Sequence, residues 1–257
     1  MTQLLSSNRD LDGKVALITG ASRGIGEAIA MALAASGADC VLTSRKPEAV
    51  AAVAANIVAN GYKATSISCH AGKMDQIEDL VKNVEGRFGK VDILVNNAAT
   101  SPQVGPMMTA TEAAWDKTFD VNVKGIFFLT QRIVPLMIRA GGGAVVNIAS
   151  IEGVRPGNTR GVYSMTKAAV ISMTRSWARE LAESNIRVNA VLPGLVYTRM
   201  ARTVIEDPEV YAQYMKDIPM HRHGTPDELA RAALFLATEA SSYMTGSLLT
   251  VDGGVLA

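Results

Sequence analysis

The sequence contains few cysteines and no excess of one charge. Its two cysteines, Cys40 and Cys69, are too few for a disulfide framework. Each falls in a strand predicted below; if the two strands are parallel neighbours, the thiols lie about 15 Å apart along the strand direction. We therefore expect both cysteines to be unreactive core residues. The 25 basic and 24 acidic residues nearly cancel, and no basic stripe indicates a nucleic-acid partner.

Targeting and membrane signals are also missing. The first dozen residues, Met1 to Asp12, are polar and lack the charged, apolar and small-residue order of a secretory signal. No apolar run approaches the ~18–20 residues that span a bilayer. We expect a soluble, cytoplasmic protein without a membrane partner.

Metal ligands are scarce. His70 is the only further ligand type beside Cys69, and His221 and His223 share a loop without a third ligand nearby. Zinc sites take at least three protein ligands. The sequence therefore predicts no metal site.

What is present is a regular alternation of short apolar runs and helical stretches, in a chain of 257 residues that is 48% hydrophobic. The predicted strands are residues 14–19, 39–44, 63–69, 91–95, 144–149, 186–192 and 247–251. The predicted helices are residues 27–36, 47–60, 74–88, 112–139, 163–183 and 226–237. This alternation predicts a parallel sheet with helices on both faces. With no linker or repeat, we expect one domain over residues 1–257, carrying a long insertion at about 196–224.

A glycine-rich loop joins the first predicted strand to the first helix. Thr19 to Gly26 contains Gly20, Gly24 and Gly26, in the spacing Gly-x-x-x-Gly-x-Gly. Glycines let backbone N–H groups approach a pyrophosphate, and the helix N-terminus adds partial positive charge. The alternative is a glycine-rich turn without a ligand. The position between strand and helix favours a dinucleotide site.

The end of the second predicted strand indicates which dinucleotide binds. An acid there would accept from a ribose 2′-hydroxyl, whereas a basic residue suits a 2′-phosphate. Here the strand ends in Ser44-Arg45-Lys46, with no acid. Arg45 offers a planar fork for phosphate, and Lys46 and Arg23 add charge. We predict NADP(H), the alternative being solvated surface charge.

Tyr163 and Lys167 lie four residues apart in a predicted helix, hence on one face. At an effective dielectric constant of ~20 and a separation of ~5 Å, attraction to the ammonium favours the phenolate by roughly 3 kcal/mol, about two pKa units. That would make Tyr163 a general acid or base, with Ser150 adding a hydrogen bond to a substrate oxygen. The alternative is a surface tyrosine that covers a lysine stem.

In order and spacing, these motifs resemble the classical short-chain dehydrogenase/reductase family over essentially the whole chain. Its glycine loop matches Thr19 to Gly26, and its Asn-Asn-Ala-Gly segment matches Asn96 to Ala99. The catalytic residues that the resemblance implies are Asn122, Ser150, Tyr163 and Lys167. The cofactor-binding residues that it implies, together with those reasoned above, are Gly20, Ser22, Arg23, Gly24, Ile25, Gly26, Ser44, Arg45, Lys46, His70, Asn97, Ala98, Ala99, Tyr163, Lys167, Pro193, Gly194, Val196 and Thr198. The implied fold is a single doubly wound Rossmann-type domain with strand order 3-2-1-4-5-6-7.

Within the family, the segments at 44–46, 69–73, 97–99, 115–118 and 185–189 look like the NADPH-dependent carbonyl and retinal reductase branch. Two positions depart from the family pattern. Ala99 replaces the usual glycine and adds a methyl group near the expected ribose. His70 stands where many members carry an aspartate that contacts the adenine, so that contact is in question.

The resemblance also implies the roles of the catalytic residues. Tyr163 would exchange a proton with the substrate oxygen, and Ser150 would orient that oxygen. Lys167 would hold the nicotinamide ribose and depress the pKa of Tyr163. Asn122 would anchor a water that links Lys167 to solvent; the alternative is a helix-bending polar residue satisfied by the backbone.

Three functions follow from this pattern. The leading one is reversible NADPH-dependent reduction of a ketone or aldehyde to an alcohol. The second is reduction of a 3-oxoacyl thioester, for which basic residues near the pocket mouth would receive an acidic carrier; the candidates are Arg155, Arg160, Arg199 and Arg202. The third is an NADP(H)-sensing regulator without turnover, which the presence of both Tyr163 and Lys167 disfavours.

The expected substrate site lies beneath the 196–224 insertion, which would act as a lid. Methionines there and after the fourth strand, namely Met200, Met215, Met220, Met107 and Met108, would line an adaptable apolar pocket or fill the core. The family suggests a homotetramer. Helices 112–139 and 163–183 carry enough apolar residues to pack on symmetry mates.

Overall fold

Seven parallel strands form one sheet in the order β3-β2-β1-β4-β5-β6-β7, which confirms the predicted topology. The computed structural model describes residues 10–257, so most of the Met1–Asp12 segment, and with it the prediction about a secretory signal, lies outside the described residues. The strands are β1 (Val15–Thr19), β2 (Asp39–Ser44), β3 (Lys63–Ser68), β4 (Ile93–Asn96), β5 (Gly143–Ile148), β6 (Ile186–Pro193) and β7 (Leu248–Val251). The helices are α1 (Gly24–Ala35), α2 (Pro47–Ala59), α3 (Met74–Phe88), α4 (Glu112–Phe119), α5 (Gly125–Arg139), α6 (Gly161–Leu181), α7 (Arg202–Ile205), α8 (Pro208–Asp217) and α9 (Pro226–Ala237).

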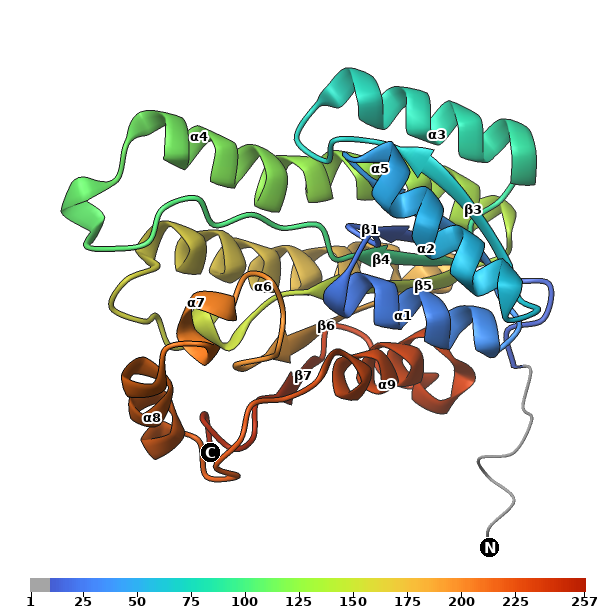
Figure 1. Ribbon diagram of the computed structural model, residues 1–257. Coiled ribbons are helices and arrows are strands. Elements are labelled where there is room, and N and C mark those ends of the chain that lie inside the picture. The colour runs from blue at the N-terminus through green and yellow to red at the C-terminus, as the bar shows by residue number, and fades with distance from the viewer. Residues whose placement is uncertain (1–9) are drawn as a thin grey trace, which may run out of the picture.

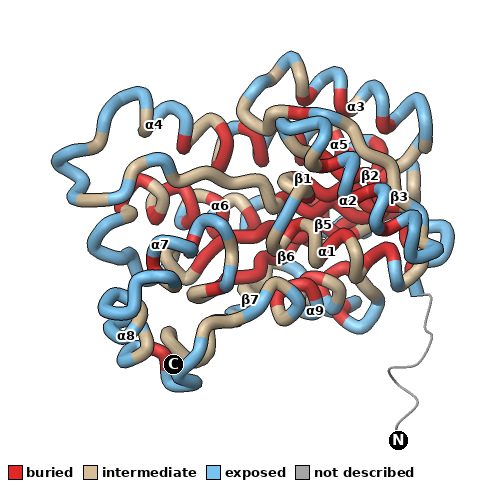
Figure 2. Tube along the Cα trace, viewed as in Figure 1, coloured by how far each residue is buried: buried red, intermediate tan, exposed pale blue. Residues whose placement is uncertain are grey.

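Helices cover both faces of the sheet (Figure 1). Apolar residues of α1, α2 and α9 pack on one face, and those of α3, α5 and α6 pack on the other. Alternate residues of β1 serve the two layers: Ile18 belongs to the first core and Leu17 to the second. A strand buried on both sides must be apolar throughout, which explains the continuous hydrophobic runs in the sequence. Figure 2 shows this burial concentrated along the central strands.

The strand order places a crevice beside β1. The chain leaves β1 toward β2 on one side, and β4 lies on the other side. Parallel strands end at the same edge, and ligands bind at that edge where the order reverses. The loops after Thr19 and Asn96 therefore face each other across the crevice.

The predicted helix 112–139 is continuous, but it contains a π-helical segment that the sequence did not indicate. Between α4 and α5, residues Asp120–Lys124 form a π-helical segment, in which the N–H of Gly125 donates to the carbonyl of Asp120. Gly125 also packs against the carbonyl of Ala71, which a Cβ would overlap. Apolar spacing alone does not reveal one inserted residue, and such insertions concentrate at functional sites.

The helix at residues 112–139 bears on the expectation that no part of the chain spans a membrane. Among the described residues, Glu112–Arg139 is the one helix long and apolar enough, by length and composition, to cross a bilayer. Of its most apolar window, 56% is buried inside the protein. Core helices pass this test as well, so the finding is weak evidence for a membrane segment.

The 196–224 insertion contains two helices that the sequence analysis did not predict, α7 and α8. Asp207 caps α8 by accepting from the N–H groups of Glu209 and Val210, and Pro208 occupies the first helical position. This is an ordinary helix-start signal. None of the residues of α8 is buried, and Figure 2 shows the exposed surface of α7 and α8 at one end of the molecule.

Candidate active site

A cavity of about 1290 Å³ lies at the carboxyl ends of the strands. It brings together almost every site residue predicted from the sequence. Those that line it are Gly20, Ser22, Arg23, Gly24, Ile25, Gly26, Ser44, Arg45, Lys46, His70, Asn97, Ala98, Ala99, Ser150, Tyr163, Lys167, Pro193, Gly194, Val196 and Thr198. Asn122 is the predicted residue that does not line it.

The glycine loop forms one wall of this cavity. Arg23 caps α1 in an extended conformation and its side chain makes no capping bond, so the first N–H groups of the helix have no side-chain partner. Gly24 has φ +59°, which a residue with a Cβ adopts rarely. A Cβ on Gly26 would overlap the Asn97 amide and the Gly20 carbonyl. The loop thus presents backbone donors closely packed at a helix N-terminus, a fit for a pyrophosphate.

Thr19 and Asn97 lock the ends of β1 and β4 together across the crevice. The Thr19 Oγ1 accepts from the N–H groups of Asn97 and Ala98, both at 3.0 Å, and donates to the carbonyl of Val95 at 3.2 Å. The Asn97 Nδ2 donates to the carbonyls of Thr19 and Gly20 at 2.8 and 3.1 Å. The segment after β4 is therefore held against the glycine loop.

At the far end of the cavity lie the basic residues that follow β2. Arg45 and Lys46 are exposed. No carboxylate of the described residues pairs with either, because neither takes part in an ion pair there. Ser44 Oγ accepts from the N–H of Lys46 at 3.4 Å. This end thus offers two unneutralised cations, as a 2′-phosphate site requires.

His70 lies beside these cations. Burial, and secondarily the charge of Arg45, hold the pKa of His70 below its ordinary value. The Nδ1 atom accepts from the N–H of Gly72 at 3.1 Å, and the backbone N–H of His70 donates to Gln76 at 2.7 Å. His70 is thus a neutral side chain with a fixed ring orientation at the cavity wall.

Tyr163 and Lys167 occupy one face of α6, as predicted. The Nζ atom of Lys167 lies over the Tyr163 ring, 5.5 Å from its centroid, and donates to the carbonyl of Ile148 at 2.7 Å. The Lys167 side chain is almost completely buried, at 1% exposure. Burial lowers the pKa of Lys167 to about 7.

The predicted effect of Lys167 on Tyr163 was wrong. Burial raises the pKa of Tyr163 to about 12, against the opposing effects of the Arg160 charge and a hydrogen bond with Ser150. A full ammonium charge in a polar medium would have favoured the phenolate. In the folded protein the low polarity disfavours both the ammonium and the phenolate, and Arg160 supplies the positive charge that acts on the phenol.

Ser150 is brought to Tyr163 by a tight turn after β5. Its Oγ accepts from the N–H of Glu152 at 3.1 Å, which caps the short helical turn Ile151–Gly153. Ser150 is buried at 7% exposure. The hydroxyl is therefore held at the cavity wall beside the phenol.

Asn122 lies behind the site, in the π-helical segment, and is fully buried. Its Oδ1 accepts from the N–H of Thr100 at 2.8 Å. Its Nδ2 donates to the carbonyl of Thr100 at 2.9 Å and to the Thr166 Oγ1 at 3.1 Å. Both amide hydrogens are thus used in joining the post-β4 segment to α6. Any water that Asn122 anchors would have to bind elsewhere on the residue.

Glu152 is a site residue that the sequence analysis missed. It lines the cavity, and its Oε2 accepts from the Ser164 hydroxyl at 2.7 Å and from the Gly157 N–H at 2.8 Å. The carboxylate thereby ties the 153–160 loop to α6. The available signal was its position, because Glu152 is the one acid between Ser150 and Tyr163.

The predicted methionine lining is mostly absent. Met200 lines the cavity, whereas the other four methionines do not. Met107 and Met108 are exposed, and Met107 packs against Gly161 instead. Met220 is also exposed, near Gly253. Methionine content therefore did not identify the pocket.

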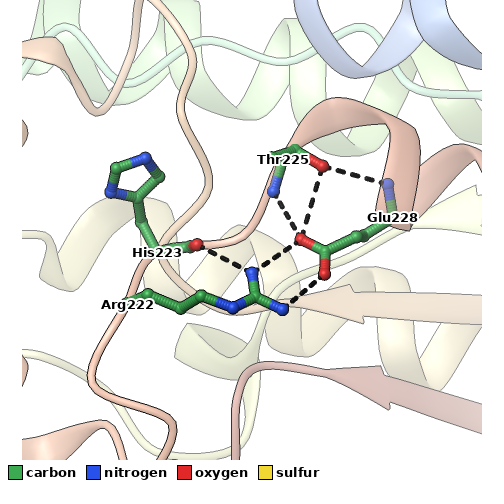
Figure 3. Close-up of polar contacts among 4 residues, drawn as sticks. All are labelled: Arg222, His223, Thr225 and Glu228. Atoms are coloured by element: carbon green, nitrogen blue, oxygen red, sulfur yellow. Dashed lines mark hydrogen bonds and ion pairs between the residues drawn. The ribbon is translucent and has the colours of Figure 1, made fainter.

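Helix α8 of the insertion contributes Val210, Gln213, Tyr214 and Asp217 to the cavity wall. At the base of the insertion, Val196 pairs with Gly224. Figure 3 shows how this base is attached to α9. Arg222 forms a two-bonded ion pair with Glu228, at 2.6 and 3.0 Å, and Glu228 accepts from the N–H of Thr225, which caps the helix in return.

The remaining histidines and the cysteines have other partners. The Tyr211 hydroxyl lies 2.8 Å from His223 Nδ1, and His221 Nδ1 lies 3.1 Å from the carbonyl of Met215. In residues 10–257, no group of three or more His, Cys, Asp or Glu could hold a metal ion. Cys40 and Cys69 are buried and free. Burial raises the pKa of both thiols, that of Cys69 to about 11, so they are unreactive at neutral pH.

Comparison with known proteins extends these observations to the whole chain. A family model described as enoyl-(acyl carrier protein) reductase matches residues 20–256. The chain is similar to dehydrogenase/reductase SDR family member 4 of Bos taurus, at 41% identity over 98% of this chain and 90% of that protein. It is also similar to the 3-oxoacyl-[acyl-carrier-protein] reductase of Thermotoga maritima, at 39% identity over 96% of this chain and 99% of that protein.

Solved structures agree. The crystal structure of a gluconate 5-dehydrogenase from Burkholderia cenocepacia, in complex with NADP and tartrate, matches with a TM-score of 0.92 and 34% identity, over 96% of this chain and 97% of that one. A 7α-hydroxysteroid dehydrogenase complexed with NADH and 7-oxo glycochenodeoxycholic acid matches with a TM-score of 0.91 and 36% identity, over 96% of both chains. The names of these proteins differ in substrate and cofactor, while the fold and the length are shared. The chain therefore belongs to the short-chain dehydrogenase/reductase (SDR) family, classical branch, whose members are oxidoreductases that act on CH–OH and C=O groups with a nicotinamide cofactor.

Proposed function

We propose that this protein is an NADPH-dependent reductase that converts a ketone or aldehyde to an alcohol, reversibly. The observation that carries the proposal is the layout of one cavity. Its one end has the glycine loop and the unpaired cations Arg45 and Lys46, and its other end has Tyr163 and Ser150. Similarity to a named dehydrogenase/reductase supports the same class of reaction.

The preference for NADP(H) rests on residues of this chain, because the solved relatives include both an NADP and an NADH complex. β2 ends without an acid, and the two cations that follow it have no carboxylate partner in the described residues. An arginine fork matches a phosphate dianion in geometry and charge.

The residues present fit the cofactor. Residues 20–26 would hold the pyrophosphate, residues 44–46 the 2′-phosphate, and residues 97–99 and Lys167 the riboses, with the 193–198 segment beside the nicotinamide. A Cβ at Gly20 or Gly26 would collide with Ala98 or Asn97, so glycine at these positions lets the loop pack against the segment after β4. When bound there, the cofactor supplies the hydride for carbonyl reduction.

The chain itself handles the proton. Because the pKa of Tyr163 is about 12, the phenol is protonated at neutral pH and can donate to the substrate oxygen. Ser150, beside it, stabilises negative charge on the same oxygen. Lys167, with a pKa near 7, can take up and pass on a proton at working pH. That Asn122 anchors a water in this relay stays a prediction.

A second candidate is reduction of a 3-oxoacyl thioester, favoured by the relative of that name. Of the four arginines expected to receive an acidic carrier, Arg155, Arg160 and Arg199 line the cavity. Arg202 does not; it pairs with Glu206 at 2.6 Å. A carrier site would therefore have three arginines rather than four.

We also propose assembly into a homotetramer through the face formed by α4, α5 and α6. Trp115 stacks on Phe119, and Phe127 lies 5.5 Å from Trp177. Trp115 and Phe127 are exposed on this face of the described chain. Light scattering on the purified protein tests the count: a monomer at micromolar concentration would contradict the assembly.

The test of the function is a screen of NADPH and NADH oxidation with ketones, aldehydes and a 3-oxoacyl thioester. We expect turnover of ketones or aldehydes with a kcat/KM at least tenfold higher for NADPH. Clear preference for NADH would overturn the cofactor assignment. Turnover of the thioester alone would select the second candidate.

A further inference from the structure

The face of α6 that lines the cavity carries a third functional position ahead of Tyr163 and Lys167. Arg160 caps α6, and the spacing 160, 163, 167 is three then four residues, which places the three side chains in one row. All three line the same cavity. The row therefore runs from a guanidinium, through the proton donor, to the buried amine.

Arg160 lies inside the site. It is half-buried, and its NH2 lies 3.4 Å from the carbonyl of Met200, in the insertion that covers the cavity. Its charge lowers the pKa of Tyr163, so the guanidinium is close to the reacting hydroxyl. A group that receives a large carrier protein would lie at the outer rim instead.

The guanidinium has no negative partner within the described chain. None of the ion pairs among residues 10–257 involves Arg160, or its cavity neighbours Arg155 and Arg199. The acids that line the cavity are Glu152 and Asp217. Glu152 is engaged with Ser164 and Gly157. A half-buried guanidinium without an acidic partner, with two exposed arginines lining the same cavity, fits an anionic ligand.

We propose that the substrate is an oxo acid, whose carboxylate binds Arg160 while its carbonyl oxygen binds Tyr163 and Ser150. This rests on the proposed reductase function and names its substrate class. Because Arg160 and Tyr163 are neighbours on one helix face, the carboxylate stands within a few bonds of the carbonyl. Arg155 and Arg199 add positive charge around the same position.

The experiment compares acids with their neutral esters: pyruvate with methyl pyruvate, and acetoacetate with ethyl acetoacetate, each with NADPH. In the wild type, kcat/KM is expected to be at least about tenfold higher for one acid than for its ester. Arg160→Gln lowers kcat/KM for that acid by about tenfold or more through KM, because a hydrogen bond to a charged group is lost. For the ester, kcat/KM falls by a smaller factor than for the acid, because both substrates share any change in the pKa of Tyr163 and only the acid loses the carboxylate contact. Arg160→Lys, which keeps the charge, recovers part of the loss.

The matched control is Arg139→Gln, an exposed arginine at the end of α5 that does not line the cavity; it leaves acids and esters unchanged. Calorimetric binding of lactate and of lactamide to the protein without cofactor gives a readout independent of turnover. Lactate is expected to bind the wild type more tightly, with the difference lost in Arg160→Gln. Esters preferred by the wild type, or acid and ester affected equally by Arg160→Gln, would overturn the proposal. If the oxo-acid proposal fails but neutral ketones are turned over, the reductase function still holds. The reductase function itself fails only if no carbonyl compound is turned over.

Discussion

Lys167 Nζ lies 5.5 Å from the centre of the Tyr163 ring and donates to the carbonyl of Ile148, so the two ionisable groups are close neighbours at the cavity wall. Burial moves their pKa values in opposite directions, Lys167 down to about 7 and Tyr163 up to about 12. Both shifts favour the uncharged forms. At neutral pH the phenol is therefore a proton donor, which suits reduction of a carbonyl.

The pKa of Lys167 makes stability depend on pH. In the unfolded chain the amine has an ordinary pKa near 10.5, whereas in the fold it is about 7. Between these values the unfolded state binds more protons, so the free energy of unfolding rises with pH, by at most ~1.4 kcal/mol per pH unit. Below pH 7 the full cost of burying the charge is present.

Lys167→Met should remove this slope. Urea unfolding of the cofactor-free protein at pH 7, 8 and 9 measures it in both proteins. We expect the free energy of unfolding of the wild type to rise with pH more steeply than that of the variant. The gain of the wild type relative to the variant should therefore grow from pH 7 to pH 9. Parallel curves for the two proteins would show that the amine is not buried as described.

Arg45→Asp should reverse the cofactor preference. The change removes the fork for a 2′-phosphate and puts an acid at the end of β2, where it can accept from a ribose hydroxyl. We expect the KM for NADPH to rise by ~10–100-fold, the value of a lost charge-assisted bond, and that for NADH to fall. Lys82→Asp on the exposed face of α3 is the control. Equal effects of both variants on NADPH would point to a general charge effect.

Much of the fold was readable because strong local signals coincide with the periodicity. Pro47 and Pro226 stand at the first positions of α2 and α9, and Gly89 ends α3 in a left-handed conformation. The predicted bounds of these three helices agree with the structure to within one residue. The π-helical segment at Asp120–Lys124 was not predicted, because it depends on the close approach of Gly125 to Ala71, which is a tertiary contact.

The features of the site also fall into two groups, those set by local sequence and those set by packing. Glycine spacing and the Tyr163–Lys167 interval are local, so sequence alone placed them. The pKa of Tyr163 is set by burial, and the pairing of Glu152 with Ser164 depends on how a loop folds onto α6. These are properties of packing, and residue spacing does not determine them.

Gly26→Ala should damage both stability and cofactor binding. The added methyl group would overlap the Asn97 amide and the Gly20 carbonyl, which hold the two loops together. Overpacking of this kind costs ~1–3 kcal/mol. Gly86→Ala in α3 is the matched control, because its Cβ meets nothing within 4 Å; it should be neutral or stabilising. Thermal unfolding and NADPH titration measure both, and a Gly26→Ala protein with wild-type affinity would contradict the assigned phosphate loop.

The central claim is that the Tyr163 phenol donates the proton, and Tyr163→Phe tests it most directly because the shape is kept and the donor removed. Tyr243→Phe, a fully exposed tyrosine, is the control. For the wild type and the two variants, we would measure NADPH oxidation with a substrate found in the screen. NADPH binding to each is measured by calorimetry. We expect kcat to fall by ~10²–10⁴-fold in Tyr163→Phe with NADPH affinity within about twofold of the wild type. Turnover near the wild-type level with binding intact would contradict the account.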